Sequence, residues 1–141
     1  MEVIPYKAEH MDRLDFQEAQ QYLTVYLDTA LRKSLEGDFS FTVMDGDEVL
    51  CCAGLVEQWE NRGLVWAYIS ETIGPGRFTV MHRHMMRLLD SMPFDRIEAS
   101  VDVGFEKGHR WVRALGFTLE APLMRRYRPD GGDSALYARV R

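Results

Sequence analysis

The segment that most constrains the fold is the uninterrupted apolar run at residues 64–69, Leu-Val-Trp-Ala-Tyr-Ile. A run of this kind is typical of a central strand that is covered on both faces of a sheet. A polar reversal at residues 60–63 precedes the run, and residues 78–92 after it carry apolar side chains at helical spacing. The sequence therefore predicts a buried strand that leads through a short loop into an amphipathic helix.

The rest of the chain alternates between strand and helix patterns. The other predicted elements are a strand at residues 1–7, a helix at 12–35, a hairpin with strands at 39–44 and 49–56, a strand at 96–103, a helix at 106–115, and strands at 117–128 and 134–140. Hairpins give antiparallel pairs, whereas the strand–helix–strand unit in the second half predicts a parallel pair. We therefore expect an α/β (α+β) fold, with a mixed, mostly antiparallel sheet of six to seven strands and helices on both faces. A length of 141 residues fits a single domain over residues 1–141.

Charge, hydropathy and cysteine usage exclude several classes of function. The net charge of −5 gives no overall basic character, so we expect no nucleic-acid partner. No stretch approaches the ~18 apolar residues of a membrane helix, and the first six residues lack a signal pattern. The adjacent Cys51 and Cys52 should point to opposite faces of a strand and stay unbridged, as in a reducing compartment. These features predict a cytoplasmic protein without a membrane partner.

The loop between the apolar run and the helix contains the candidate binding site. Its sequence is Glu-Thr-Ile-Gly-Pro-Gly at residues 71–76, followed by Arg77. Unpaired N–H groups and the helix dipole form an anion site at a helix N-terminus, and glycines let a diphosphate approach the backbone. Arg77 would add a charged contact. The alternative is an ordinary tight turn, and Pro75 removes one donor from the site.

Two motifs in this chain resemble the GNAT superfamily of N-acetyltransferases. Glu71-x-x-Gly74-Pro75-Gly76 stands where that family has a Gln/Arg-x-x-Gly-x-Gly/Ala phosphate loop, and residues 111–117 resemble its Tyr-x-x-x-Gly-Phe helix end. The order of elements is similar along nearly the whole chain. The tail at residues 115–139 also resembles acetyltransferase-like proteins of tailed phages and prophages, some of which are internal virion components.

The resemblance implies a binding site for acetyl-CoA. By position, the pantetheine arm would run along the backbone of Tyr68, Ile69 and Ser70. The pyrophosphate would meet the amides of the loop and the first helical turn, namely Ile73, Gly74, Gly76 and Arg77. The partners are then acetyl-CoA and an amine acceptor, with no metal, since His82 and His84 are two residues apart on a helix and face different directions.

The residues that would perform catalysis depart from the family pattern. Val112 stands where the family tyrosine protonates the leaving thiolate, and Phe105 stands where an asparagine is usual. Acetyl transfer needs a base, donors that polarise the thioester carbonyl and an acid for the sulfur. Glu57 and Glu71 are the candidate bases, and Tyr68 and Tyr127 are the candidate acids. The alternative roles are a solvated strand-end charge for Glu57 and packing for either tyrosine.

The sequence supports two hypotheses of function. The first is an acyl-CoA N-acyltransferase in which the amine attacks the thioester directly in a ternary complex. The second is a catalytically weak or inactive GNAT-like protein that serves as a structural or internal component of a phage or prophage virion. The expected assemblies are a homodimer in the first case and a virion in the second.

Overall fold

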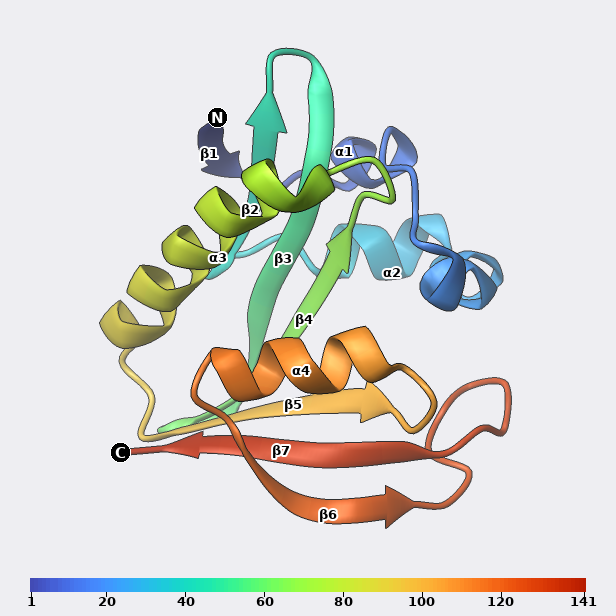
Figure 1. Ribbon diagram of the computed structural model, residues 1–141, viewed down its shortest axis with the longest axis vertical. Coiled ribbons are helices and arrows are strands. Elements are labelled where there is room, and N and C mark those ends of the chain that lie inside the picture. The colour runs from blue at the N-terminus through green and yellow to red at the C-terminus, as the bar shows by residue number, and fades with distance from the viewer. The chain divides into compact units, whose positions relative to one another are not determined.

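The computed structural model describes residues 1–141, and Figure 1 shows its elements. In chain order they are β1 (Glu2–Pro5), α1 (Ala8–Asp12), the 3-10 helix η1 (Glu18–Val25), α2 (Thr29–Ser34), β2 (Ser40–Asp45), β3 (Glu48–Trp59), β4 (Arg62–Ile69), α3 (Gly74–Ser91), β5 (Arg96–Asp102), α4 (Glu106–Ala114), β6 (Thr118–Met124) and β7 (Ser134–Val140). The seven strands form one sheet in the order β1-β2-β3-β4-β5-β7-β6. This is the mixed α/β fold that the sequence predicts.

The pairing of the strands confirms the predicted directions. β1 with β2, β2 with β3, β5 with β7, and β6 with β7 are antiparallel. β4 and β5 are parallel, and their register joins Arg62, Gly63 and Leu64 to Arg96, Ile97 and Glu98. The sheet is therefore mostly antiparallel, with one parallel pair where the chain crosses over through α3.

The Cα positions group into two compact units, which are described separately. Unit 1 contains residues 1–56 and 66–83, and unit 2 contains residues 57–65 and 84–141. The chain passes from one unit to the other within β3, β4 and α3. That residues 1–141 act as one domain stays a prediction.

The prediction of one long helix at residues 12–35 is wrong. Two short helices, η1 and α2, replace it, because residues on both sides of η1 bond elsewhere. The Glu71 N–H donates to the carbonyl of Asp15 at 2.8 Å, and Phe16 forms a β-bridge with Ser70. The Asp28 side chain accepts the Leu31 N–H at 2.8 Å and thereby starts α2 as a new helix. Of the apolar residues in this region, Leu27 is buried, whereas Tyr26 and Leu31 are 40% and 42% exposed.

The core of unit 1 lies between β1–β3 and these short helices. It contains the buried residues Tyr6, Met11, Leu14, Phe16, Leu27, Met44, Val49 and Cys52, with Trp66 and Tyr68 packed against it. Trp66 and Tyr68 are only half-buried, so the expectation that β4 is covered on both faces is wrong for this part of the strand. Cys51 and Cys52 are buried and unbridged, as predicted.

Unit 2 is built around β5, with β7 paired along its length and α4 packed beside it (Figure 1). The buried carboxylate of Glu98 binds two guanidinium groups, through Arg62 Nε at 2.6 Å and Arg96 Nε at 2.7 Å. Arg96 reaches on to Glu120 of β6 at 2.6 Å. An alternating row of charges thus links β4, β5 and β6. None of the helices in the chain combines the length and apolar character that a membrane span requires.

Candidate functional site

The loop after β4 is fixed by bonds to β3 and within itself. Ser70 is buried, and its N–H donates to the Leu50 carbonyl of β3 at 2.8 Å. Its hydroxyl oxygen accepts the Thr72 N–H at 3.2 Å and lies 3.0 Å from Thr72 Oγ1. The Ile73 N–H donates to the Ser70 carbonyl at 3.3 Å. Residues 70–73 therefore form a tight, internally bonded turn.

The bond from Ser70 to Leu50 also fixes the orientation of the preceding backbone groups. Successive residues of a strand direct their N–H groups to opposite sides, so a neighbouring residue faces the other way. The N–H of Ile69 therefore points away from β3, whereas that of Ser70 is already bonded to it. Of the three strand residues expected beside the pantetheine arm, Ile69 offers the donor on the side away from β3.

Helix α3 begins four residues earlier than predicted, at Gly74 instead of Phe78. The predicted loop residues 74–77 are therefore its first turn. Inside an α-helix the first N–H groups have no partner. Pro75 has no N–H, and that of Ile73 is bonded within the turn, so the donors left at this helix end are Gly74 and Gly76.

The two glycines differ in what the fold demands of them. Gly74 has φ = +72°, a conformation that side chains other than glycine rarely adopt. Gly76 has no such φ, and a Cβ built on it would meet no atom within 4 Å. Neither local conformation nor packing explains a glycine at position 76, where it weakens the helix by about 0.5–1 kcal/mol relative to alanine. The space above this backbone is open.

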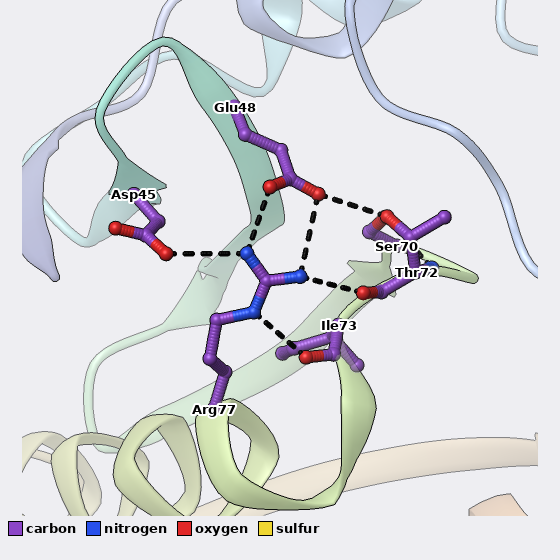
Figure 2. A network of polar contacts seen from close by, with 6 residues as sticks. All are labelled: Asp45, Glu48, Ser70, Thr72, Ile73 and Arg77. Carbon is purple, nitrogen blue, oxygen red and sulfur yellow. Dashed lines mark hydrogen bonds and ion pairs between the residues drawn. The ribbon is translucent and has the colours of Figure 1, made fainter.

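The side chain of Arg77 is bound by the protein (Figure 2). Its Nη1 atom lies 2.7 Å from Glu48 Oε2 and 3.2 Å from Asp45 Oδ2, at the two ends of the β2–β3 turn. Its Nη2 atom donates to the Thr72 carbonyl at 2.6 Å and its Nε atom to the Ile73 carbonyl at 2.8 Å. The guanidinium that the sequence analysis expected to contact a phosphate is thus paired with the carboxylates of Asp45 and Glu48.

Glu71 is held by the N-terminal segment of the chain. Its Oε2 atom accepts the N–H of Glu18, the first residue of η1, at 3.1 Å. A carboxylate at the start of a helix stabilises the unpaired N–H groups there. This contact explains an acidic residue at the first position of the phosphate-loop motif, where the resemblance leads one to expect glutamine or arginine.

The comparisons with known proteins give structural matches only. No family model matches the sequence, and no curated protein does. Ard1 from Thermoplasma volcanium matches with a TM-score of 0.77 at 13% identity, covering 99% of this chain and 96% of that one. The GNAT-family acetyltransferase from Bacillus anthracis matches with a TM-score of 0.70 at 10% identity, covering 98% and 93%. The chain has the GNAT fold. Ribosomal-protein-S5-alanine acetyltransferase from Vibrio fischeri gives a TM-score of 0.66 at 19% identity, covering 98% and 91%.

Within this GNAT fold, the predicted catalytic residues fall in different units. Glu71 lies in unit 1, next to the loop described above. Glu57 lies in unit 2 on the exposed end of β3, and Tyr127 lies in unit 2 in the turn after β6, where it is 49% exposed. The structure brings the loop residues 70–77 and Glu71 together. Roles for Glu57 and Tyr127 stay predictions.

The residue at which the resemblance leads one to expect a tyrosine is a buried valine. Val112 of α4 is 8% exposed, so its side chain belongs to the interior. Phe105 stands at the N-cap of the same helix without a side-chain cap bond, and its ring lies against Gly108. Neither side chain carries a group that exchanges protons.

Sequence reasoning missed two polar elements that the structure shows. The first is His109, which is half-buried and bonded to Tyr137. The engagement of Arg77 by Asp45 and Glu48 also had no local signal, although acidic residues on both sides of a turn are visible in the sequence. No group of three or more His, Cys, Asp or Glu side chains lies close enough to hold a metal ion.

Proposed function

We propose that this protein is a GNAT-type N-acyltransferase that transfers acetyl from acetyl-CoA to an amine of a small molecule or protein. The observation that carries the proposal is Gly76. It is a glycine in the first turn of α3 that neither φ nor packing requires, with open space above its backbone. A glycine there lets a bulky anion approach the N–H groups of Gly74 and Gly76. The resemblance to the GNAT phosphate loop supports the same assignment, because that loop precedes a helix in the family.

The residues of unit 1 fit such a ligand. The N–H groups of Gly74 and Gly76, with the helix dipole, would hold the pyrophosphate. The Ile69 N–H points away from β3 and is the proposed donor to the thioester carbonyl, with Tyr68 and Ser70 beside the pantetheine arm. Polarisation of that carbonyl is the step in which aligned backbone donors contribute most. Bound acetyl-CoA supplies the activated acyl group.

Proton transfer is the less defined part of the proposal. The amine must lose a proton to attack, and the departing sulfur must gain one. Glu57 and Glu71 remain the proposed bases and Tyr127 the proposed acid. The Glu18 N–H occupies Oε2 of Glu71, so the Oε1 atom of this carboxylate retains acceptor capacity after the end of β4.

The direct test is calorimetric titration with acetyl-CoA, using Gly76→Glu and a matched control. Glutamate at the third position of α3 favours the helix, so the variant should fold at least as stably as the wild type. It should nevertheless lose acetyl-CoA binding through bulk and charge. Gly37→Glu is the control, because Gly37 also has no atom within 4 Å of a built Cβ and lies in the same unit. Unchanged affinity in Gly76→Glu would reject the loop assignment, and absence of heat with wild type would reject the function.

The buried Val112 favours a second candidate, a GNAT-like protein without turnover that assembles into a phage or prophage virion. Such a protein needs no proton donor for a thiolate. Recovery of the chain in stoichiometric amounts from purified particles would support this candidate. Turnover with any member of a broad amine panel would count against it. The homodimer and the cytoplasmic location stay predictions, and size-exclusion chromatography with light scattering tests the dimer.

A further inference from the structure

One guanidinium group binds two consecutive peptide carbonyls at the start of α3 (Figure 2). Arg77 Nη2 donates to the Thr72 carbonyl at 2.6 Å, and Arg77 Nε donates to the Ile73 carbonyl at 2.8 Å. These are the last two carbonyls before the helix begins at Gly74. The contacts are charge-assisted and therefore stronger than bonds between neutral groups.

Binding the Ile73 carbonyl fixes the direction of the next N–H group. All peptide bonds of the chain are trans, so the C=O of Ile73 and the N–H of Gly74 point in opposite directions from one plane. With its C=O held toward Arg77, the peptide group presents the Gly74 N–H on the side away from the guanidinium. A cation on the carbonyl also polarises the peptide and strengthens its N–H as a donor.

The guanidinium is in turn held from the opposite side. Glu48 Oε2 lies 2.7 Å and Asp45 Oδ2 lies 3.2 Å from Arg77 Nη1. Glu48 Oε1 also accepts the Thr72 hydroxyl at 2.9 Å, so this carboxylate binds both the guanidinium and the loop. The turn between β2 and β3 thereby anchors Arg77, and the position of Arg77 is set before any ligand arrives.

From this geometry we infer that Arg77 is a positioning residue for the anion site, and that it acts through the peptide between Ile73 and Gly74 instead of by touching the phosphate. The inference rests on the proposed function for its natural ligand, coenzyme A. A direct contact between the guanidinium and a phosphate would break the bonds to Glu48 and Asp45. The donors to the phosphate are the backbone N–H groups of Gly74 and Gly76, and Arg77 with Glu48 orients the first of them.

The test measures binding by NMR, following the amide resonances of Gly74 and Gly76 in ¹⁵N-labelled protein. Three probes are titrated: coenzyme A, pantetheine, which lacks phosphates, and inorganic pyrophosphate. Arg77→Met keeps the aliphatic stem and removes every donor, and it should weaken coenzyme A and pyrophosphate binding about tenfold or more. Pantetheine binding should stay within about twofold of wild type, because only the phosphate donors are disturbed.

Two further variants separate positioning from charge and from folding. Arg83→Met removes an equal charge from an exposed position of the same helix and should leave all three affinities unchanged. Glu48→Gln leaves Arg77 in place and loosens its anchor, so it should weaken coenzyme A and pyrophosphate binding by a smaller factor than Arg77→Met. If Arg77→Met alters neither binding nor the Gly74 resonance, the inference is wrong. It is equally wrong if pantetheine loses as much affinity as coenzyme A.

The design distinguishes failure of this inference from failure of the proposed function. Coenzyme A binding that Arg77→Met does not change would leave the acyltransferase proposal standing and reject the positioning role. Pyrophosphate that shifts Gly74 and Gly76 in wild type, but not in Arg77→Met, would support the positioning role even if coenzyme A does not bind. Wild-type protein in which none of the probes shifts these amides would reject both.

Discussion

The hydroxyl of Tyr137 lies 2.7 Å from Nδ1 of His109. The other ring nitrogen of His109, Nε2, lies 3.0 Å and 2.9 Å from the carbonyl oxygens of Asp102 and Val103. Carbonyls only accept, so Nε2 carries a proton, and in the neutral imidazole Nδ1 accepts the Tyr137 hydroxyl. One imidazole thus joins α4, the end of β5 and β7.

Removal of His109 should therefore destabilise unit 2 more than removal of the Tyr137 hydroxyl. His109→Ala leaves the hydroxyl of a side chain that is 1% exposed without its partner, at a cost of about 1–3 kcal/mol in the free energy of unfolding. Tyr137→Phe removes one bond, worth about 0.5–1.5 kcal/mol. Urea denaturation of both variants and of the double variant measures these values. The double variant should lose less than the two single losses added together, and strict additivity would contradict the pairing.

Alanine at the two glycines of α3 should shift stability in opposite directions. Gly74→Ala forces a side chain into φ = +72° and should cost about 1–2 kcal/mol. Gly76→Ala meets no atom and improves helix propensity, so it should stabilise the protein by about 0.5–1 kcal/mol. Thermal or urea unfolding checks both values. Loss of stability in Gly76→Ala would show that the fold itself requires this glycine and would weaken the proposed function.

The ion pair between Arg77 and Glu48 should make stability depend on acidic pH. Hydrogen bonds from Arg77, and then from Thr72, hold the pKa of Glu48 below its usual value of 4.5. A carboxyl whose pKa is lower in the folded protein contributes stability above the unfolded-state pKa and loses it as the pH falls through the folded value. Below pH 4.5, the free energy of unfolding should therefore decrease less in Glu48→Gln than in wild type.

The control for this titration is Asp47→Asn, the neighbouring carboxylate in the same turn. This variant leaves Asp45 and Glu48, the two carboxylates that bind Arg77, unchanged. Parallel profiles for Glu48→Gln and wild type over about one to two pH units on either side of 4.5 would contradict a role for this ion pair in stability.

Variants of Glu71 should separate its contact with η1 from a role as base. Glu71→Ala removes the acceptor for the Glu18 N–H and should cost about 1 kcal/mol, the size of an N-cap effect. Glu71→Gln keeps a side-chain oxygen and should retain most of that stability. If Glu71 is also the base, both variants lose turnover at neutral pH, and Glu71→Gln does so without unfolding. Full activity in Glu71→Gln would leave Glu57 as the remaining candidate.

The bounds of a helix or strand were predicted most accurately where a turn sequence and an apolar pattern gave the same boundary. β7 was predicted at the bounds that the structure shows, because the turn at residues 129–132 sets its start. The prediction for residues 12–35 failed because an apolar repeat at three and four residues does not require one continuous helix. Leu27 is buried, but neither η1 nor α2 contains a buried residue. The bond between Glu71 and Asp15 that divides this region joins residues far apart in the chain.

The candidate site was predicted in its backbone but not in its side chains. The Gly-Pro-Gly segment indicated a helix start, and proline in the first turn is compatible with α3 beginning at Gly74. The partners of Arg77 flank the turn between β2 and β3. The sequence of the loop at residues 71–76 does not indicate that this turn lies beside it. From the sequence, the Arg77 guanidinium was interpreted as a ligand contact because it stands next to the candidate phosphate loop. The structure shows that it binds Glu48 and Asp45 instead.

The burial of Val112 limits which side chains can be introduced at position 112. A phenol ring introduced at this position would have to fit an interior that is filled by an isopropyl group, and such overpacking costs about 1–3 kcal/mol. Its hydroxyl would then lie in the interior and would need a hydrogen-bond partner there. A design that adds a phenolic acid to α4 would therefore have to remodel the neighbours of position 112 as well.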